Sequence, residues 1–128
     1  MSAGKYNFIV EQGSQHEVTF RYKLSDGNYQ NLTGYRVRMS VKDHITDTTF
    51  VYQATSDTSA AGEESFNAHF ALSDQSATPG QFVLTIPANT TKLLSFGQGV
   101  YDMELVSSNG VVTRLLEGKF KLKPEVSN

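Results

Sequence analysis

The chain has 128 residues, a length that suits one domain with a continuous buried core. Hydrophobic residues make up 38% of it and charged residues 19%, with eight Phe and six Tyr, which excludes a disordered chain. The formal net charge of -2 excludes a broad positive field for nucleic acid or anionic lipid, and the absence of cysteine excludes disulfides and thiolate metal sites. We therefore expect one domain over residues 1–128, with no nucleic-acid or membrane partner and no cofactor.

Alternation of apolar and polar residues predicts strands in the first part of the chain. In residues 16–24 the apolar side chains occupy even positions, and in residues 35–42 they occupy odd positions. One face of each strand is thus expected to be buried and the other wet. Residues 7–11 and 50–54 are shorter candidate strands. The polar stretch over residues 55–65 predicts a long loop, which we expect to be the most mobile segment.

Alternation resumes in residues 66–72 and, after a Pro-Gly turn, in residues 81–86, so both segments are predicted core strands. Residues 87–96 contain a Pro and a capping-type Asn before helix-compatible residues. One short helical turn is therefore predicted there, and Gly97 ends it.

The strongest hairpin signal lies in residues 100–116, where two alternating runs flank an Asn-Gly turn. A three-residue loop places Glu104 opposite Arg114, so that opposite charges pair across the ladder. We expect Arg114→Ala to lower the free energy of unfolding by less than about 1 kcal/mol if this pair is exposed.

On the other face of the same hairpin, the register places Met103 opposite Leu115. Gly118 interrupts the last strand and permits a bulge, which would bring both Leu115 and Leu116 near the core. Together with the strands expected near the two ends of the chain, the pattern predicts about seven or eight short strands, as in a sandwich or small barrel.

Three histidines, His16, His44 and His69, are the candidates for acid–base chemistry at neutral pH or for metal ligation. Their spacing matches no ligand motif. We interpret them as surface histidines, because alternation places His69 on a wet face, His16 begins a strand and His44 lies in an expected turn. No nucleophile elbow or phosphate-binding loop is present either, so the sequence predicts no catalytic, cofactor-binding or metal-binding residue.

Acidic residues form three small groups, which we interpret as solvated or structural charge. Their members are Asp43 with Asp47, Asp57 with Glu63 and Glu64, and Asp102 with Glu104. The first two groups lack the residue order of a calcium loop. The third lies on one strand face beside basic partners, which favours a structural ion pair over a glycosidase pair.

Two features of the sequence concern carbohydrate, either attached to the chain or bound by it. Asn-x-Thr sequences begin at Asn31 and Asn89, and we interpret both asparagines as turn residues. Tyr6, Tyr29 and Tyr52, if exposed, could stack on a sugar, although Tyr is also a common strand residue. A carbohydrate-binding module for host-surface glycans is therefore an alternative function.

Several sequence blocks occur together at the two ends and in the first third of the chain. They are Gly4-Lys5-Tyr6-Asn7-Phe8 with Glu11-Gln12-Gly13, Asn31-Leu32-Thr33-Gly34-Tyr35 followed by Val37-Arg38-Met39, Tyr101-Asp102-Met103-Glu104-Leu105, Val112-Thr113-Arg114-Leu115-Leu116-Glu117-Gly118 and Lys123-Pro124-Glu125-Val126. In these blocks the chain resembles a family of small structural proteins of tailed bacteriophages, including those that infect cyanobacteria. It is also similar to the immunoglobulin-like N-terminal domain of phage baseplate upper proteins. Residues 45–79 carry no part of the resemblance.

The resemblance implies an all-β, immunoglobulin-like antiparallel β-sandwich and a non-enzymatic virion structural protein. Such a protein would dock to other virion proteins in the tail, baseplate or neck, in multiple copies, with decoration of the capsid head surface as an alternative. The start of the chain has no signal-peptide pattern, so we expect assembly in the host cytoplasm and a final location in the virion. The loop over residues 55–65 and the two termini are the expected contact arms.

Overall fold

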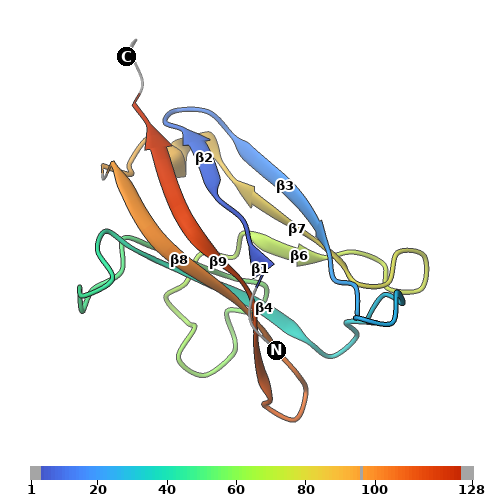
Figure 1. Ribbon diagram of the computed structural model, residues 1–128. Helices are drawn as coiled ribbons and strands as arrows, with labels where there is room; N and C mark the ends of the chain where they lie inside the picture. Colours follow the sequence, from blue (N-terminus) through green and yellow to red (C-terminus); the bar gives the residue numbers. More distant parts are fainter. Residues whose placement is uncertain (1–3, 96, 125–128) are drawn as a thin grey trace.

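The computed structural model describes residues 4–95 and 97–124, which form two β-sheets packed into a sandwich (Figure 1). The larger sheet has six strands in the order β1-β9-β8-β4-β5, with β2 also paired to β9. Its strands are β1 (Gly4–Lys5), β2 (Phe8–Glu11), β4 (Arg36–Lys42), β5 (Tyr52–Thr55), β8 (Gln98–Val106) and β9 (Val112–Lys123). The smaller sheet has the order β3-β7-β6, from β3 (His16–Arg21), β7 (Gln81–Ile86) and β6 (Phe70–Leu72). The predicted all-β sandwich is confirmed.

Two details of the strands differ from the prediction. The N-terminal strand is divided into β1 and β2, and both run parallel to β9, whereas the other pairings are antiparallel. Asn7 lies at the division, where its Oδ1 accepts the Lys119 backbone N–H at 2.9 Å and so takes the place of a ladder bond.

The predicted helical turn is α1 (Ala88–Thr91), which follows Pro87 directly. No helix in the described ranges has the length and apolar character needed to cross a membrane.

The core lies between the two sheets and follows the predicted alternation. In β4 the odd-numbered residues Val37, Met39 and Val41 are buried, and the even-numbered residues between them face outward. Aromatic rings fill the middle of the core, with the Phe8 ring centroid 4.9 Å from Tyr101 and 5.4 Å from Phe120. Edge-on and tilted contacts of this kind add to the hydrophobic stabilisation from burial.

The register of the β8–β9 hairpin agrees with the prediction near the turn and departs from it further away. Glu104 pairs with Arg114 as predicted, but Met103 pairs with Leu116 and not with Leu115. The shift is a bulge between Met103 and Glu104, opposite Leu115. The predicted bulge at Gly118 is therefore wrong, because the extra residue is inserted three positions earlier.

Gly118 has a different role, which depends on the division between β1 and β2. It pairs with Tyr101, and a Cβ atom at this position would lie 2.3 Å from the backbone oxygen of Tyr6. The same oxygen accepts a hydrogen bond from the Tyr101 hydroxyl at 2.5 Å. Only glycine allows the N-terminal segment to approach β9 this closely.

Candidate functional site

The outer face of the six-stranded sheet carries a groove of about 670 Å³. Strands β4, β8 and β9 form its floor, and the segment over residues 56–66 forms one wall. Charged and polar side chains line the floor, among them Arg38, Ser40, Asp102, Glu104, Arg114 and Glu117. Apolar side chains lie on the rim, where Ile45 is 77% and Phe50 is 47% exposed. The face that alternation predicted to be wet is thus a hollowed surface.

Strand register arranges the floor charges in rows. In one row Ser40, Asp102 and Glu117 lie side by side across β4, β8 and β9. In the next row Arg38 and Glu104 are adjacent. Like charges directly opposite one another destabilise a sheet, so the row that contains two carboxylates depends on cations nearby.

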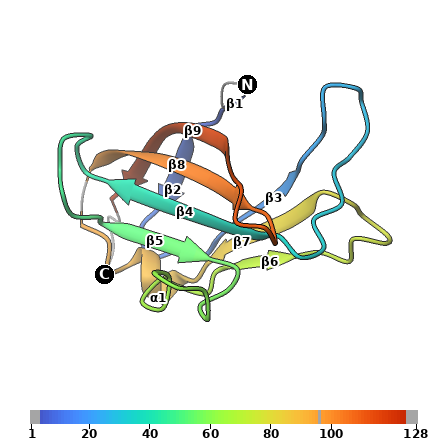
Figure 2. The ribbon, with the colours of Figure 1, turned by 90° about the horizontal axis from the view of Figure 1, so that it is seen from below.

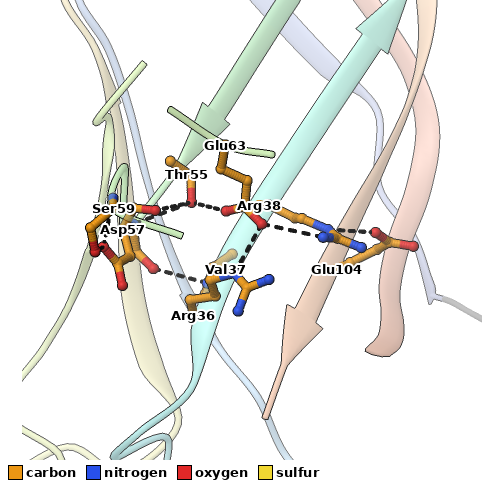
Figure 3. A network of polar contacts seen from close by, with 9 residues as sticks. Arg36, Val37, Arg38, Thr55, Asp57, Ser59, Glu63 and Glu104 are labelled. Carbon is orange, nitrogen blue, oxygen red and sulfur yellow. Dashed lines mark hydrogen bonds and ion pairs between the residues drawn. The ribbon is translucent and has the colours of Figure 1, made fainter. Parts of the chain in front are cut away.

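Glu63 is the buried charge of the groove, at 1% exposure. Figure 3 shows its carboxylate between two arginines of β4 and a threonine of β5. One oxygen accepts from Arg36 Nε at 2.9 Å and from Arg38 at 3.2 Å, and the other accepts from Thr55 Oγ1 at 2.5 Å. Arg38 also donates from Nε to Glu104 at 2.9 Å, so a chain of ion pairs links the wall to the floor. A buried carboxylate with this many donors is stabilised in its charged form.

The wall is also ordered along its own backbone. Successive turns form hydrogen bonds from the backbone N–H of Ala60 to Asp57, of Glu63 to Ala60 and of Phe66 to Glu63. Asp57 accepts a further backbone bond from Ser59 at 3.0 Å, which closes the first turn. The predicted long loop over residues 55–65 is present, and Glu63 fastens it to the sheet.

Two acids of the groove have shifted pKa values, in opposite directions. Burial alone would raise the pKa of Glu63, but the hydrogen bonds from Thr55 and the two arginines outweigh it, and its pKa lies below the ordinary value. Burial raises the pKa of Asp102, and the nearby Glu104 charge raises it further. Asp102 is therefore the floor carboxylate whose negative charge is least well compensated.

Arg114 does not form the predicted ion pair with Glu104, although the two residues are paired in the ladder. Arg38 takes the Glu104 carboxylate, because it approaches from β4 on the same face. The guanidinium of Arg114 instead lies 3.6 Å from Asp102 and 3.9 Å from Glu117, and its side chain is 53% exposed. These contacts are longer than hydrogen bonds, so Arg114 compensates the two carboxylates only in part.

Two of the three histidines are not surface residues. His69 is half-buried and its Nδ1 lies 2.6 Å from the Tyr52 hydroxyl. His16 is half-buried as well, with its ring centroid 6.0 Å from that of Phe8. His44 is exposed, as predicted. Alternation placed His69 on the wet face, whereas His16 shares the even-numbered, inward positions of Val18 and Phe20 in its strand, a signal that could have identified it.

His44 lies close to two carboxylates in the turn after β4. Its Nδ1 is 3.9 Å from Asp43 Oδ2 and 3.8 Å from Asp47 Oδ2, and one ligand atom from each residue falls within 4.8 Å of the others. Asp47 Oδ2 also accepts the His44 backbone N–H at 3.0 Å. This bond caps the turn and places both acids in the loop after β4.

The aromatic residues proposed for sugar stacking do not form a platform. Tyr52 is 4% exposed, Tyr6 packs edge-on against Phe8, and the ring of Tyr29 is covered by the Arg21 guanidinium at 3.7 Å. The interpretation of these tyrosines as exposed is therefore wrong for Tyr6 and Tyr52, whereas Tyr29 is 40% exposed. Of the two Asn-x-Thr sequences, the first begins a turn in which the asparagine side chain accepts a backbone bond at 2.8 Å, and the second lies in α1.

Comparison with family models and with curated proteins finds no match. Among solved structures, the chain is similar to the crystal structure of CopC from Methylosinus trichosporium OB3b. The two chains are 17% identical, the match covers 99% of this chain and 90% of that chain, and the TM-score is 0.44. A likeness at this level carries no argument about what this chain binds.

The function predicted from the sequence is corrected here. CopC is not a phage protein, and no family model or curated protein supports the predicted role in a phage tail, baseplate or neck, which is withdrawn. The alternatives of capsid decoration and glycan binding are withdrawn with it. The geometry of the groove is the basis for the function proposed below.

Proposed function

We propose that this chain is a non-catalytic binding domain whose groove holds a segment of a partner polypeptide. The groove combines exposed apolar side chains on its rim with fixed charges of both signs on its floor. Protein-binding surfaces are typically built from an apolar or aromatic anchor region together with arginines and satisfied polar groups. This combination is the observation that supports the proposal.

The floor charges indicate which side chain the segment would present. Asp102 has a raised pKa because it is buried and lies near Glu104, and Arg114 approaches it no closer than 3.6 Å. A lysine or arginine of the partner would supply the missing positive charge. Ile45 and Phe50 on the rim would contact apolar residues on either side of it. The expected ligand is therefore a segment with a basic residue flanked by apolar ones.

The groove is organised before any ligand arrives. Glu63 holds the wall against β4 through both Arg36 and Arg38. A preformed site avoids the free-energy cost of ordering the wall upon binding. The same ion pairs engage the Glu63 and Glu104 carboxylates, which supports a binding role and not general acid–base catalysis.

A displayed library of random peptides tests this function on the intact chain. We expect the wild-type chain to enrich peptides that share a basic residue between apolar ones. Ser40→Phe fills the groove floor and should abolish their binding, whereas Thr19→Phe, on the outward side of the smaller sheet, should leave it unchanged. Circular dichroism verifies that both variants fold. Failure to enrich any peptide, or equal binding by the Ser40→Phe variant, would refute the proposal.

A further inference from the structure

One open edge of the sandwich is closed by His69, which precedes β6. Its ring stacks on that of Tyr52 in β5, with 5.9 Å between centroids and 19° between ring planes. Nδ1 lies 2.6 Å from the Tyr52 hydroxyl. Burial raises the pKa of Tyr52, so the hydroxyl keeps its proton and donates it to a neutral His69 that carries its own proton on Nε2. This contact joins the smaller sheet to the larger one.

The opposite edge is closed by His16, the first residue of β3. Its ring meets Phe8 of β2 at 6.0 Å between centroids and 64° between ring planes. Nε2 is buried and has no hydrogen-bond partner among the residues that the structure describes. A neutral imidazole nitrogen tolerates such a site at modest cost, whereas a protonated Nε2 would be a buried N–H with no acceptor among the described residues.

The two histidines occupy equivalent places in the architecture. Strands β3 and β6 are the two edges of the smaller sheet, and β2 and β5 lie toward the two opposite edges of the larger one (Figure 2). At each side, therefore, a half-buried histidine of one sheet packs on a buried aromatic ring of the other. We call these the His16 clasp and the His69 clasp.

We propose that the two clasps make the sandwich acid-sensitive, because protonation of His16 and His69 loosens both edges where the sheets meet. A proton on Nδ1 of His69 takes away the acceptor of the Tyr52 hydroxyl proton, so the hydroxyl must turn that proton elsewhere and accept from Nδ1–H instead. A proton on His16 places a charge against Phe8 and leaves a buried N–H without an acceptor among the described residues. This inference concerns the fold and does not depend on the ligand of the groove.

The surroundings of the clasps determine the direction of the pH dependence. Burial lowers the pKa of both histidines below the ordinary value of 6.5, and for His16 the charge of Glu11 at the end of β2 opposes this shift. The β7 residues nearest to them are uncharged, since Ile86 pairs with His16 and the Thr85 backbone N–H donates to His69. Because the folded state binds these protons less readily than the unfolded state, stability is complete above pH 6.5 and is lost as the pH falls below it.

The test measures unfolding in urea at pH 7.5 and pH 5.5, where carboxylates titrate little. A histidine that stays neutral in the folded state over this range, and whose unfolded pKa is near 6.5, raises the unfolding equilibrium constant by at most about tenfold. We expect His16→Gln and His69→Gln each to remove part of the wild-type change, and the double variant to remove nearly all of it. His44→Gln is the matched control, because His44 is exposed, and it should behave as wild type.

Two further measurements on the wild-type chain keep the inference testable if a variant fails to fold. Nuclear magnetic resonance should show His16 and His69 titrating below the ordinary pKa of 6.5. Amide protection factors, corrected for intrinsic exchange rates, should fall at β3, β5 and β6 between pH 7.5 and 5.5 while β8 stays protected. Titration of either clasp histidine at or above pH 6.5, or a loss of protection that is uniform across the strands, would overturn the proposal.

Discussion

Removal of the Glu63 carboxylate should detach the groove wall from the sheet. Glu63 is the one acidic residue of the wall whose side chain reaches both Arg36 and Arg38. Its neighbour Glu64 is exposed and provides a matched control one residue away. Glu63→Ala is the informative substitution, and Glu63→Gln retains the shape of the side chain while it removes the charge.

The magnitude follows from the hydrogen bonds that are lost. Three donors bind the carboxylate, and a hydrogen bond to a charged group contributes about 1.5–3 kcal/mol when its partners are buried. Arg36 and Arg38 are partly exposed, so water would replace some of this interaction in the variant. Arg38 would also retain its ion pair with Glu104. We therefore expect Glu63→Ala to lower the free energy of unfolding by about 3 kcal/mol, and Glu63→Gln by about half as much.

Urea denaturation and thermal melting at pH 7 measure these changes, and a loss of about 3 kcal/mol corresponds to about 10 °C in Tm. Because the pKa of folded Glu63 is lowered, its contribution is complete above the ordinary value of 4.5 and is lost as the pH falls through the folded pKa. The free energies of unfolding of the wild type and of Glu63→Gln should therefore become equal in acid. If Glu63→Ala loses no more stability than Glu64→Ala, the ion pairs do not hold the wall and the reasoning fails.

Three other contacts are tested by the same denaturation assay. Gly118→Ala should lower the free energy of unfolding by about 3 kcal/mol or more, because its Cβ would lie 2.3 Å from the Tyr6 oxygen. Gly97→Ala is the control and should lower it by less than about 1 kcal/mol, because no described heavy atom lies within 4 Å of the added Cβ. Tyr101→Phe removes the hydrogen bond to Tyr6 and should cost about 1 kcal/mol, with faster amide exchange in β1 as a second readout. Arg114→Ala should cost less than about 1 kcal/mol, because its ion pairs are long and its side chain is 53% exposed; a loss several times larger would show that these pairs are stronger than their geometry indicates.

Local sequence pattern was sufficient for the strands and for the part of the hairpin near its turn. Alternation depends on which face of a strand is buried, and this is a property of neighbouring residues, so β3, β4, β7 and β8 were found from it. The pairing of Glu104 with Arg114 was found because an Asn-Gly turn sets the register of the strands beside it. Further from the turn the register also depends on how β1 and β2 pack against β9, which the hairpin sequence does not encode.

The groove wall could not be predicted, because its fastening joins residues that are far apart in the chain. Glu63 lies in a polar stretch whose composition is that of an exposed loop, and its partners Arg36 and Arg38 are more than twenty residues earlier. The one available signal was that β4 carries two arginines on its predicted wet face. Two adjacent cations on one strand face require acidic partners, and such partners can come from any acidic segment.

The edge histidines and the groove wall are connected through the chain itself. The wall begins after Thr55 of β5 and returns to the sandwich at Asn67, whose backbone N–H donates to Gln53 of the same strand. His69 follows two residues later and holds β5 through Tyr52. The wall is therefore fastened at its middle by the Glu63 carboxylate and near its end by the His69 imidazole. Both pKa values are lowered in the folded state, so each contribution begins to be lost as the pH falls below the ordinary value, which is 6.5 for His69 and 4.5 for Glu63. Acid should consequently weaken the end of the wall before its middle.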